Sequence, residues 1–295
     1  MIDLLLSFDG EEPGAAALAA ALDVPLRPIV RHRFPDGETR LQLPSSLPPR
    51  VALLRGLQQP NEKLAELMIV APAARELGAR RLTLVCPYLA YMRQDMAFQP
   101  GEAVSQRHVG RALAGWFDAL VTVDPHLHRV ASMDEVVPGR RGIALSAAPL
   151  LGAHAAAHAR QPFLLGPDEE AAAWVRSAAQ ARGLAHAVCT KRRSGDRDVA
   201  VTLPDDDFRG REVVLIDDVA STGRTLAVTA AALRARGAAA VDVAVTHALF
   251  VGDALEQLAQ AGVRHVWSSD SVPHPSNVVA LAPLLATALR TPFEN

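Results

Sequence analysis

The segment Glu212–Gly237, EVVLIDDVASTGRTLAVTAAALRARG, has the pattern of a strand, a short polar loop and a helix. Val213–Ile216 is an apolar, mostly β-branched run typical of a buried parallel strand, and Asp217 and Asp218 are expected to end it. Small and hydroxylated residues follow. The next apolar residues are spaced as one face of a helix that ends before Gly237: Leu226, Ala230 and Leu233.

This turn predicts a site for a phosphorylated sugar. Backbone N–H groups and hydroxyls at a helix N-terminus favour a phosphate, and the helix dipole adds to that preference. Two adjacent carboxylates would repel the phosphate unless they bind sugar hydroxyls or a hard divalent cation. An ordinary strand–turn–helix with an acidic cap is the alternative, and the flanking apolar strand and helix favour the phosphate site.

The composition indicates a large α/β protein and excludes several functional classes. The chain has 295 residues, 49% of them hydrophobic, which is enough for one large or two medium cores. A net charge of −2 without a basic stripe argues against nucleic acid as a partner. The sequence shows neither a signal peptide nor an apolar run long enough for a membrane span, and Cys86 and Cys189 are interpreted as free core thiols of a cytoplasmic protein.

The two halves of the chain have the same order of elements. Val51–Tyr91 and Val213–Phe250 each contain a strand, a loop, a helix ended by glycine, a second strand and an aromatic loop. This repeat predicts two similar α/β domains, at residues 1–144 and 145–295. The first copy's loop, Arg55–Pro60, has neither paired acids nor Thr-Gly, so only the second copy is expected to bind the sugar phosphate.

Further elements are expected around these motifs. Asn61 and Ser105 are predicted to cap helices that run to about Leu77 and Trp116. Additional strands and helices are expected at the following ranges: strands 2–6, 81–85, 121–124, 163–165, 186–189, 241–245 and 265–267, and helices 13–21, 252–260 and 281–289.

Polar loops follow several of the predicted strands, where ligands bind in open α/β sheets. Residues 33–39 contain Pro-Asp-Gly and are typical of a hairpin turn. Residues 93–102 form either a solvated loop or a phosphate-binding loop around Arg93, whose guanidinium suits phosphates and aromatic rings. His126 either helps to place a nucleotide-bound Mg²⁺ or is a core histidine, and the His-x-His pair lacks the partners of a zinc site.

The second half adds two charged segments. Asp168 follows the strand at 163–165, where it either caps the next helix or faces a nucleotide-bound metal. Three consecutive cations, Lys191-Arg192-Arg193, follow the predicted strand at 186–189 and precede Ser-Gly. This pattern indicates either a solvated charge run or a mobile basic flap suited to polyphosphate. Asp205–Asp207 is interpreted as a loop without assigned chemistry.

The segment at 212–237 resembles the 5-phosphoribosyl 1-diphosphate (PRPP) binding signature shared by phosphoribosyltransferases and ribose-phosphate diphosphokinases. The wider chain, from about Phe34 to Asn277, resembles the ribose-phosphate diphosphokinases, in particular their compact archaeal-type members. The ordered set of motifs carries this resemblance: Phe-x-Asp-Gly-Glu at 34–38, Arg-Gln-Asp at 93–95, Gly-Glu-x-x-Ser at 101–105, Asp-x-His at 124–126, Gly-Pro-Asp at 166–168, Lys-Arg-Arg at 191–193 and the Asp-Asp loop.

The resemblance implies two tandem phosphoribosyltransferase-like (Rossmann-like) domains with parallel central sheets flanked by helices. It also implies a role for each matching residue. Ribose 5-phosphate is bound by Asp217, Asp218, Ser221, Thr222, Gly223, Arg224 and Thr225. ATP is bound by Phe34, Asp36, Glu38, Arg93, Gln94, Asp95 and His126, and the metal by His126 and Asp168. Lys191 and Arg193 are the implied catalytic cations.

The implied reaction moves the β,γ-diphosphoryl group of MgATP to the anomeric hydroxyl of ribose 5-phosphate, giving PRPP and AMP. The implied cofactor is Mg²⁺. The loop with Phe34, Asp36 and Glu38 reaches a neighbouring subunit's ATP site in that family, which implies a homodimer or a higher homo-oligomer.

Two alternatives remain open from the sequence: a phosphoribosyltransferase that consumes PRPP, and a catalytically silent regulatory subunit. The chain also departs from the family pattern twice. Ser221 stands where many relatives carry an acid, and Arg224 stands where glycine is usual. A long cation at position 224 could either strengthen phosphate binding or block the pocket.

Overall fold

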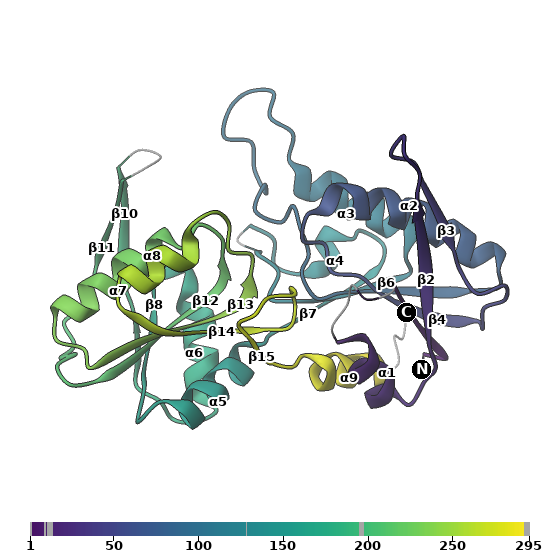
Figure 1. The fold of residues 1–295 in the computed structure, drawn as a ribbon. Helices are drawn as coiled ribbons and strands as arrows, with labels where there is room; N and C mark the ends of the chain where they lie inside the picture. The colour runs from purple at the N-terminus through teal and green to yellow at the C-terminus, as the bar shows by residue number, and fades with distance from the viewer. Residues whose placement is uncertain (1, 9, 11–13, 128, 195–197, 292–295) are drawn as a thin grey trace. The chain divides into compact units, whose positions relative to one another are not determined.

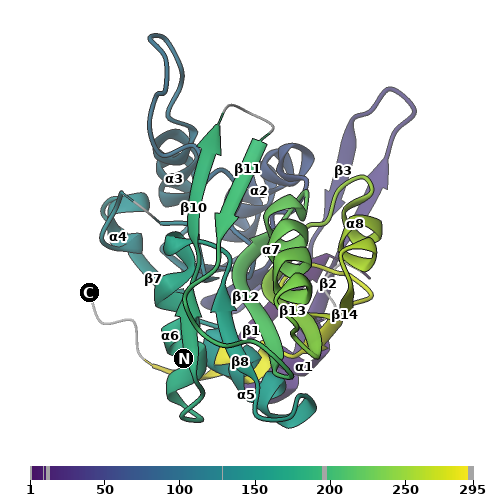
Figure 2. The same ribbon diagram turned by 90° about the vertical axis from the view of Figure 1, so that its left-hand side faces the viewer.

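The protein consists of two α/β units, described by a computed structural model for residues 2–8, 10, 14–127, 129–194 and 198–291. The first unit contains the chain up to Leu145 together with the C-terminal helix α9 (Ala282–Arg290), and the second contains Ser146–Ala280. Each unit is a sheet with helices packed against it (Figures 1 and 2). None of the described helices is both long and apolar enough to span a bilayer.

The first unit has a seven-stranded sheet in the order β3-β2-β1-β4-β5-β6-β7. Its strands are β1 (Leu4–Phe8), β2 (Leu26–Arg33), β3 (Thr39–Gln42), β4 (Arg50–Leu54), β5 (Arg81–Cys86), β6 (Ala119–Val123) and β7 (Arg141–Leu145). All neighbouring strands in this order are parallel except β2 and β3, which form an antiparallel hairpin. The remaining helices are α1 (Ala15–Leu22), α2 (Pro60–Glu76), α3 (Ser105–Trp116) and α4 (Met133–Val136).

The second unit has a six-stranded parallel sheet in the order β15-β14-β13-β12-β8-β9, and β10 and β11 form a separate antiparallel hairpin. The strands are β8 (Phe163–Gly166), β9 (His186–Val188), β10 (Thr190–Ser194), β11 (Asp198–Thr202), β12 (Glu212–Ala220), β13 (Ala240–Ala248), β14 (Val263–Ser269) and β15 (Asn277–Val279). The helices are α5 (Ala148–His158), the short 3₁₀ turn η1 (Glu169–Ala171), α6 (Ala172–Gln180), α7 (Arg224–Ala235) and α8 (Ala254–Gln260).

The central strand β12 is buried on both faces. Val213 and Leu215 pack into a core with α7 and α8, whereas Val214 and Ile216 pack into a second core with α5 and α6. Successive residues of a strand point to opposite faces, so a strand covered on both sides needs an unbroken apolar run. The predicted parallel α/β architecture is therefore confirmed.

The structure corrects the expected end of this strand. Asp217 and Asp218 do not terminate β12, which continues to Ala220 and remains paired with the equally long β13. The ladder uses backbone groups, so polar side chains do not interrupt it while a partner strand is present.

Two expected helix caps are also wrong. Helix α2 begins at Pro60 after Gln59, and the Asn61 side chain instead accepts a hydrogen bond from the Tyr91 hydroxyl. Proline suits the first helical position because that position has no intrahelical use for an N–H. Ser105 is the first residue of α3, and the residue before it, Val104, makes no side-chain cap.

Helix α9 belongs to the first unit, although the sequence-based division assigned residues 145–295 to the second. Arg290 donates a hydrogen bond to the carbonyl of Ala21 in α1. Leu285 and Leu289 of α9 are buried. An amphipathic pattern predicts that a helix has a buried face, but it does not predict which sheet that face packs against.

The two cysteines, Cys86 and Cys189, are buried and free, as expected.

The expected repeat is present as β4-α2-β5 in one unit and β12-α7-β13 in the other, each a pair of adjacent parallel strands joined by a helix. Aligning Val51–Leu54 with Val213–Ile216 places Arg55 at the position of Asp217. Arg55 is only 1% exposed, pairs with Glu66, and its guanidinium carbon lies 3.9 Å from the centre of the Phe8 ring. In the first unit a buried cation thus replaces the acid of the second.

Glu66 joins this buried arginine to the β2–β3 hairpin. Its other oxygen lies 2.6 Å from Nε of Arg31, which is on β2. A second ion pair, Arg33–Glu62, also links β2 to α2, but its side chains are 54% and 72% exposed. Only the buried pair is expected to contribute strongly to folding, because exposed pairs are screened by water.

We predict that Glu66→Gln lowers the free energy of unfolding by about 3 kcal/mol, because it leaves the buried Arg55 without a counter-charge. Urea denaturation measures the change. The matched control Glu62→Gln, in the exposed pair, should change it by less than about 1 kcal/mol. Equal effects of the two substitutions would contradict the importance assigned to the buried pair.

Candidate functional site

The loop after β12 has the geometry expected of an anion site. It spans Ser221–Gly223, and Gly223 immediately precedes α7 with φ 69°. A side chain there would be strained, and its Cβ would lie 3.4 Å from the carbonyl oxygen of Ala254. The first N–H groups of α7 have no intrahelical acceptors, so they and the loop hydroxyls are available to a ligand at the positive end of the helix dipole.

The segment after β13 supports this loop from one side. The N–H groups of Leu249 and Phe250 both donate to the carbonyl of Ala220 at 3.0 Å. The N–H of Val251 donates to the carbonyl of Ser221, also at 3.0 Å. The backbone of the loop is therefore held by a neighbouring strand end, a contact that no motif in the sequence indicated.

Three carboxylates gather beside the loop. Asp218 is buried, and Oδ1 of Asp217 accepts a hydrogen bond from its N–H at 3.0 Å. Burial raises the pKa of Asp217 well above its usual range, and the charges of Asp218 and then Asp168 raise it further. Asp168 follows β8, the neighbour of β12, so parallel pairing places it at the same sheet edge.

Asp168 also caps the next helical turn, which was one of the two roles that the sequence left open for it. Its Oδ1 accepts a hydrogen bond from the N–H of Glu170 at 3.1 Å at the start of η1. The charge of Asp168 also affects the pKa of the Cys189 thiol. Burial raises that pKa to about 12, and the nearby carboxylate of Asp168 adds to the shift. At neutral pH Cys189 is therefore a neutral thiol.

A buried hydrogen-bond network lies next to this edge and was missed by the sequence analysis. Nδ1 of His247, on β13, is 2.8 Å from Oγ of Ser271, which donates to the carbonyl of Thr246 at 2.8 Å. Ser269 donates to the same carbonyl at 2.6 Å. His247 lies opposite Val219 in the sheet, one residue beyond Asp218. The only sequence signal for this network is the pair of serines at the end of β14, Ser269 in the strand and Ser271 two residues later.

The basic segment forms a hairpin. Lys191 and Arg193 are on β10 and pair with Val201 and Val199 of β11. The hairpin projects from the second unit in both views (Figures 1 and 2). The structure describes the backbone of Lys191 and Arg193 and not their side chains, and residues 195–197 lie outside the described part of the chain.

The Pro-Asp-Gly segment of the first unit forms the predicted turn, at the tip of the β2–β3 hairpin. The N–H of Phe34 donates to the carbonyl of Glu38 at 2.8 Å, and the N–H of Glu38 donates to Oδ1 of Asp36 at 3.1 Å. Gly37 has φ 95°, which other residues rarely adopt. The Phe34 side chain is 38% exposed. The turn thus presents one aromatic and two acidic side chains at a projecting tip.

The Arg-Gln-Asp loop lies between β5 and α3. Arg93 is exposed, and Gln94 donates to the carbonyl of Met96 at 3.3 Å. Asp95 is buried and forms an ion pair with Arg129, with 2.9 Å between Oδ1 and Nη1. Arg129 was not singled out by any motif, because its partner is more than thirty residues earlier in the chain.

His126 lies in the loop after β6, the strand beside β5, and is partly buried. The turn into this loop is strained, since Asp124 has φ 37°. His128, the other histidine of the His-x-His pair, lies outside the described residues. His126 belongs to the first unit and Asp168 to the second. Among the described residues, no group of three or more His, Cys, Asp or Glu side chains is arranged to hold a metal ion.

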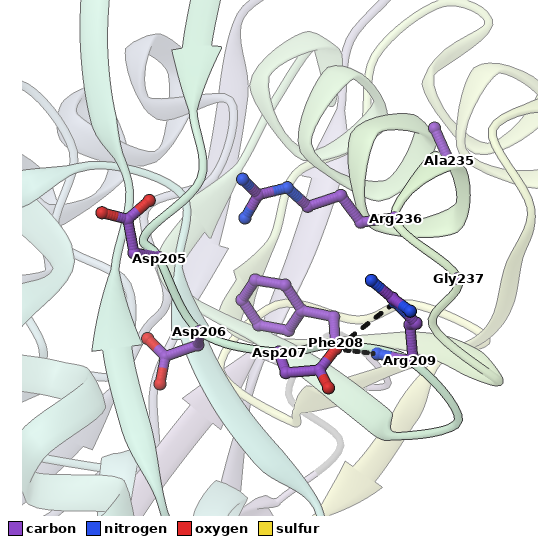
Figure 3. Close-up of a pocket in the computed structure, with 8 residues that line it drawn as sticks. All are labelled: Asp205, Asp206, Asp207, Phe208, Arg209, Ala235, Arg236 and Gly237. Atoms are coloured by element: carbon purple, nitrogen blue, oxygen red, sulfur yellow. Dashed lines mark hydrogen bonds and ion pairs between the residues drawn. The ribbon is translucent and has the colours of Figure 1, made fainter.

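A hollow of about 600 Å³ lies at the opposite, amino-terminal edge of the second sheet. It is lined by residues of the loop before β12 and of the end of α7, including Asp205–Asp207, Arg209 and Arg236 (Figure 3). Arg236 donates to the carbonyl of Pro204 at 2.8 Å, and Arg209 is 3.9 Å from Asp207. All three acids are exposed, so this hollow does not compete with the loop at 217–225 as the candidate site.

Comparisons with known proteins identify the family. The model of the N-terminal domain of ribose phosphate pyrophosphokinase matches residues 4–115, and that of the phosphoribosyl transferase domain matches residues 134–277. The chain is 37% identical over 276 residues to the ribose-phosphate pyrophosphokinase of Methanopyrus kandleri, covering 92% of this chain and 93% of that protein. It is 35% identical over 288 residues to the enzyme of the same name from Halobacterium salinarum, covering 97% and 100%.

A solved structure agrees with these sequence matches. The phosphoribosylpyrophosphate synthetase of Mycobacterium smegmatis superposes with a TM-score of 0.83 at 26% identity, over 98% of both chains. The resemblance found in the sequence, including the two phosphoribosyltransferase-like domains, is therefore confirmed. Both the matched motifs and nearly the full length of the chain agree that this protein belongs to the ribose-phosphate pyrophosphokinase family of enzymes.

Proposed function

We propose that this enzyme transfers the β,γ-diphosphoryl group of MgATP to the anomeric hydroxyl of ribose 5-phosphate, producing PRPP and AMP. The observation that carries the proposal is the carboxyl edge of β12, where Asp217 and Asp218 adjoin a loop and a helix N-terminus. A diol-binding pair beside a phosphate-binding turn matches both ends of ribose 5-phosphate.

In this proposal the sugar phosphate lies across the loop after β12. Asp217 and Asp218 accept hydrogen bonds from the ribose hydroxyls, directly or through a metal. The 5-phosphate receives hydrogen bonds from the N-terminal turn of α7, to which Ser221, Thr222, Gly223 and Thr225 contribute. Arg224, exposed at the first position of α7, adds a positive charge next to that phosphate.

The nucleotide is assigned to loops of the first unit. Arg93, Gln94 and Asp95 form one side of its site, and His126 forms another. Phe34, Asp36 and Glu38 are proposed to complete the ATP site of a neighbouring copy, which makes a homodimer or a higher homo-oligomer the active form. The projecting tip and the exposed Phe34 ring support this assignment.

The transfer step is an in-line displacement. The anomeric oxygen forms a bond to the β-phosphorus while the bond from that phosphorus to the α–β bridging oxygen breaks, and the hydroxyl proton passes to water. AMP leaves with the bridging oxygen. Catalysis of this kind depends on positioning and on neutralising charge in the transition state. Lys191 and Arg193 are the residues that we assign to that charge.

Mg²⁺ fits the residues at this edge as a companion of the nucleotide. Magnesium is usually held by one or two carboxylates together with substrate phosphates and water, and Asp168 and the Asp217–Asp218 pair provide carboxylates. Burial raises the pKa of Asp217 and the charges of Asp218 and Asp168 raise it further, and a divalent cation would relieve this repulsion. When bound with ATP, the ion supplies positive charge to the phosphates. Asp168 and His126 are the residues proposed to bind it.

The reaction is tested by its products. We expect ³¹P NMR of the protein with ribose 5-phosphate, ATP and Mg²⁺ to show AMP and PRPP in equal amounts and no ADP. ADP formation would mean ordinary phosphoryl transfer and would overturn the proposal. Absence of any reaction in folded protein would favour the silent subunit, and PRPP consumption with a nucleobase would favour the transferase.

The flap cation is tested by Lys191→Ala. We expect kcat to fall by about 100-fold or more, because the transition-state charge is no longer neutralised. The affinity for ribose 5-phosphate, measured by calorimetry, should change little. Arg192→Ala removes a cation from the same strand and serves as the control. Turnover close to normal in Lys191→Ala would remove this lysine from the mechanism.

The departure at position 224 is tested by Arg224→Gly. Within the described part of the chain the guanidinium has no ion-pair partner, so it is available to a phosphate. Loss of one charge-assisted hydrogen bond should raise the KM for ribose 5-phosphate about tenfold with little change in kcat. Arg224→Lys retains the charge and should stay near normal. A large gain in activity in Arg224→Gly would instead show that the arginine obstructs the site.

A further inference from the structure

The Asp95 carboxylate is engaged on both of its oxygens by one arginine. Nη1 of Arg129 lies 2.9 Å from Oδ1 and 3.0 Å from Oδ2. The Asp95 side chain is 3% exposed, whereas that of Arg129 is 53% exposed. A buried carboxylate is costly without a counter-charge, so this ion pair is the reason that Asp95 can be buried at all.

The pair connects two loops that follow neighbouring strands. Asp95 lies after β5 and Arg129 lies after β6, and these strands pair in parallel with Cys86 opposite Thr122. The two loops therefore begin at the same sheet edge, and Asp95–Arg129 is an ion pair between them beyond the end of the backbone ladder. The ion pair holds the loop that carries Arg93 and Gln94 against the loop that carries His126.

The two ends of the Arg-Gln-Asp loop are held differently. Gln106 of α3 is 3% exposed, its N–H donates to the carbonyl of Gln94, and its side chain donates to the carbonyl of Met92, both at 3.2 Å. Further along, Phe98 is 66% exposed, and its N–H bonds within the loop to Glu102 at 2.7 Å. Asp95 thus lies where the anchored part of the loop meets the projecting part.

We propose that Asp95 is a positioning residue that acts through Arg129, and that it does not itself contact the nucleotide. The ion pair sets the spacing between Arg93 and Gln94 on one loop and His126 on the other. This inference rests on the proposed function, which assigns the nucleotide to the loops with Arg93, Gln94, Asp95 and His126, and it changes the role of Asp95 within that site. It also explains how an acid is tolerated beside a polyanion. Its charge is already neutralised, so it does not repel the phosphates of ATP.

A double-mutant cycle tests the proposal. Asp95→Asn and Arg129→Met should each raise the KM for ATP by about tenfold, because small misplacement of binding groups is costly. The double variant should be no worse than either single variant, since all three lack the same ion pair. The KM for ribose 5-phosphate, whose proposed site is in the other unit, should stay within about twofold in every variant.

The arginine-to-lysine exchange separates positioning from a general loss of stability. A single nitrogen makes both contacts to Asp95, so the lysine of Arg129→Lys can replace it and should restore most of the ATP affinity. Arg176→Met, on the exposed face of α6 in the other unit, is the matched control and should behave like the unchanged enzyme. Arg129→Met leaves the buried Asp95 carboxylate without its counter-charge, whereas Asp95→Asn removes that charge, so urea denaturation of each variant separates a loss of fold from a loss of ATP affinity.

The possible results distinguish a failure of this inference from a failure of the proposed function. If Asp95→Asn raises the KM for ATP while Arg129→Met does not, Asp95 contacts the nucleotide directly and the inference is wrong. Additive effects in the double variant would also overturn it. If the unchanged protein forms ADP, or forms no PRPP, the proposed function fails instead. Calorimetric titration with ATP then still reports whether the two residues act as one unit.

Discussion

The parallel pairing of β12 with β8 on one side and β13 on the other is the constraint on which the second unit depends. Three strands that end at one edge place their following residues together, whatever their separation in the chain. Asp168 follows β8, Asp217 and Asp218 lie near the end of β12, and His247 lies near the end of β13. Because β12 and β13 extend past their apolar runs, acidic residues are held on a rigid strand and not in a loop.

At the corresponding position of its repeat, the first unit carries a residue of opposite charge. Where the second unit has Asp217, the first has Arg55, neutralised by Glu66 and covered by Phe8. The first unit therefore lacks the paired acids that we propose to bind the ribose diol, and its Arg55–Glu66 ion pair is part of the fold. Glu66 also binds Arg31 on β2, so the buried pair helps to hold the hairpin that carries Phe34. Corresponding positions of the repeat thus carry paired acids in one unit and a structural ion pair in the other.

The ion pairs of the first unit differ in how far their carboxylates are exposed to water. Asp95 and Glu66 are buried carboxylates, and each is matched by arginine, whereas the Arg33–Glu62 pair lies in water. A buried acid without a partner would be far more costly than the loss of a surface pair. Arginine serves both buried acids because its guanidinium can reach them from a half-exposed or a fully buried position and stays charged.

Much of this protein was determined by the sequence alone. The apolar run before Asp217 and the glycine after each helix of the repeat identified the α/β class and the duplication, because both depend on local periodicity. The family was identified by the resemblance of an ordered set of short motifs. The Pro-Asp-Gly turn was predicted for the same reason, since Asp36 and Gly37 suit that backbone locally.

Only the tertiary structure decided the contacts between distant segments. Arg129 pairs with Asp95, Ser271 pairs with His247, and α9 packs in the first unit; no spacing rule links these partners. The length of β12 also depended on its partner, because a backbone ladder continues for as long as the neighbouring strand does, even through two carboxylates. Local chemistry selects the type of each element, and the neighbours that it meets in the fold decide where it ends and what its polar groups bind.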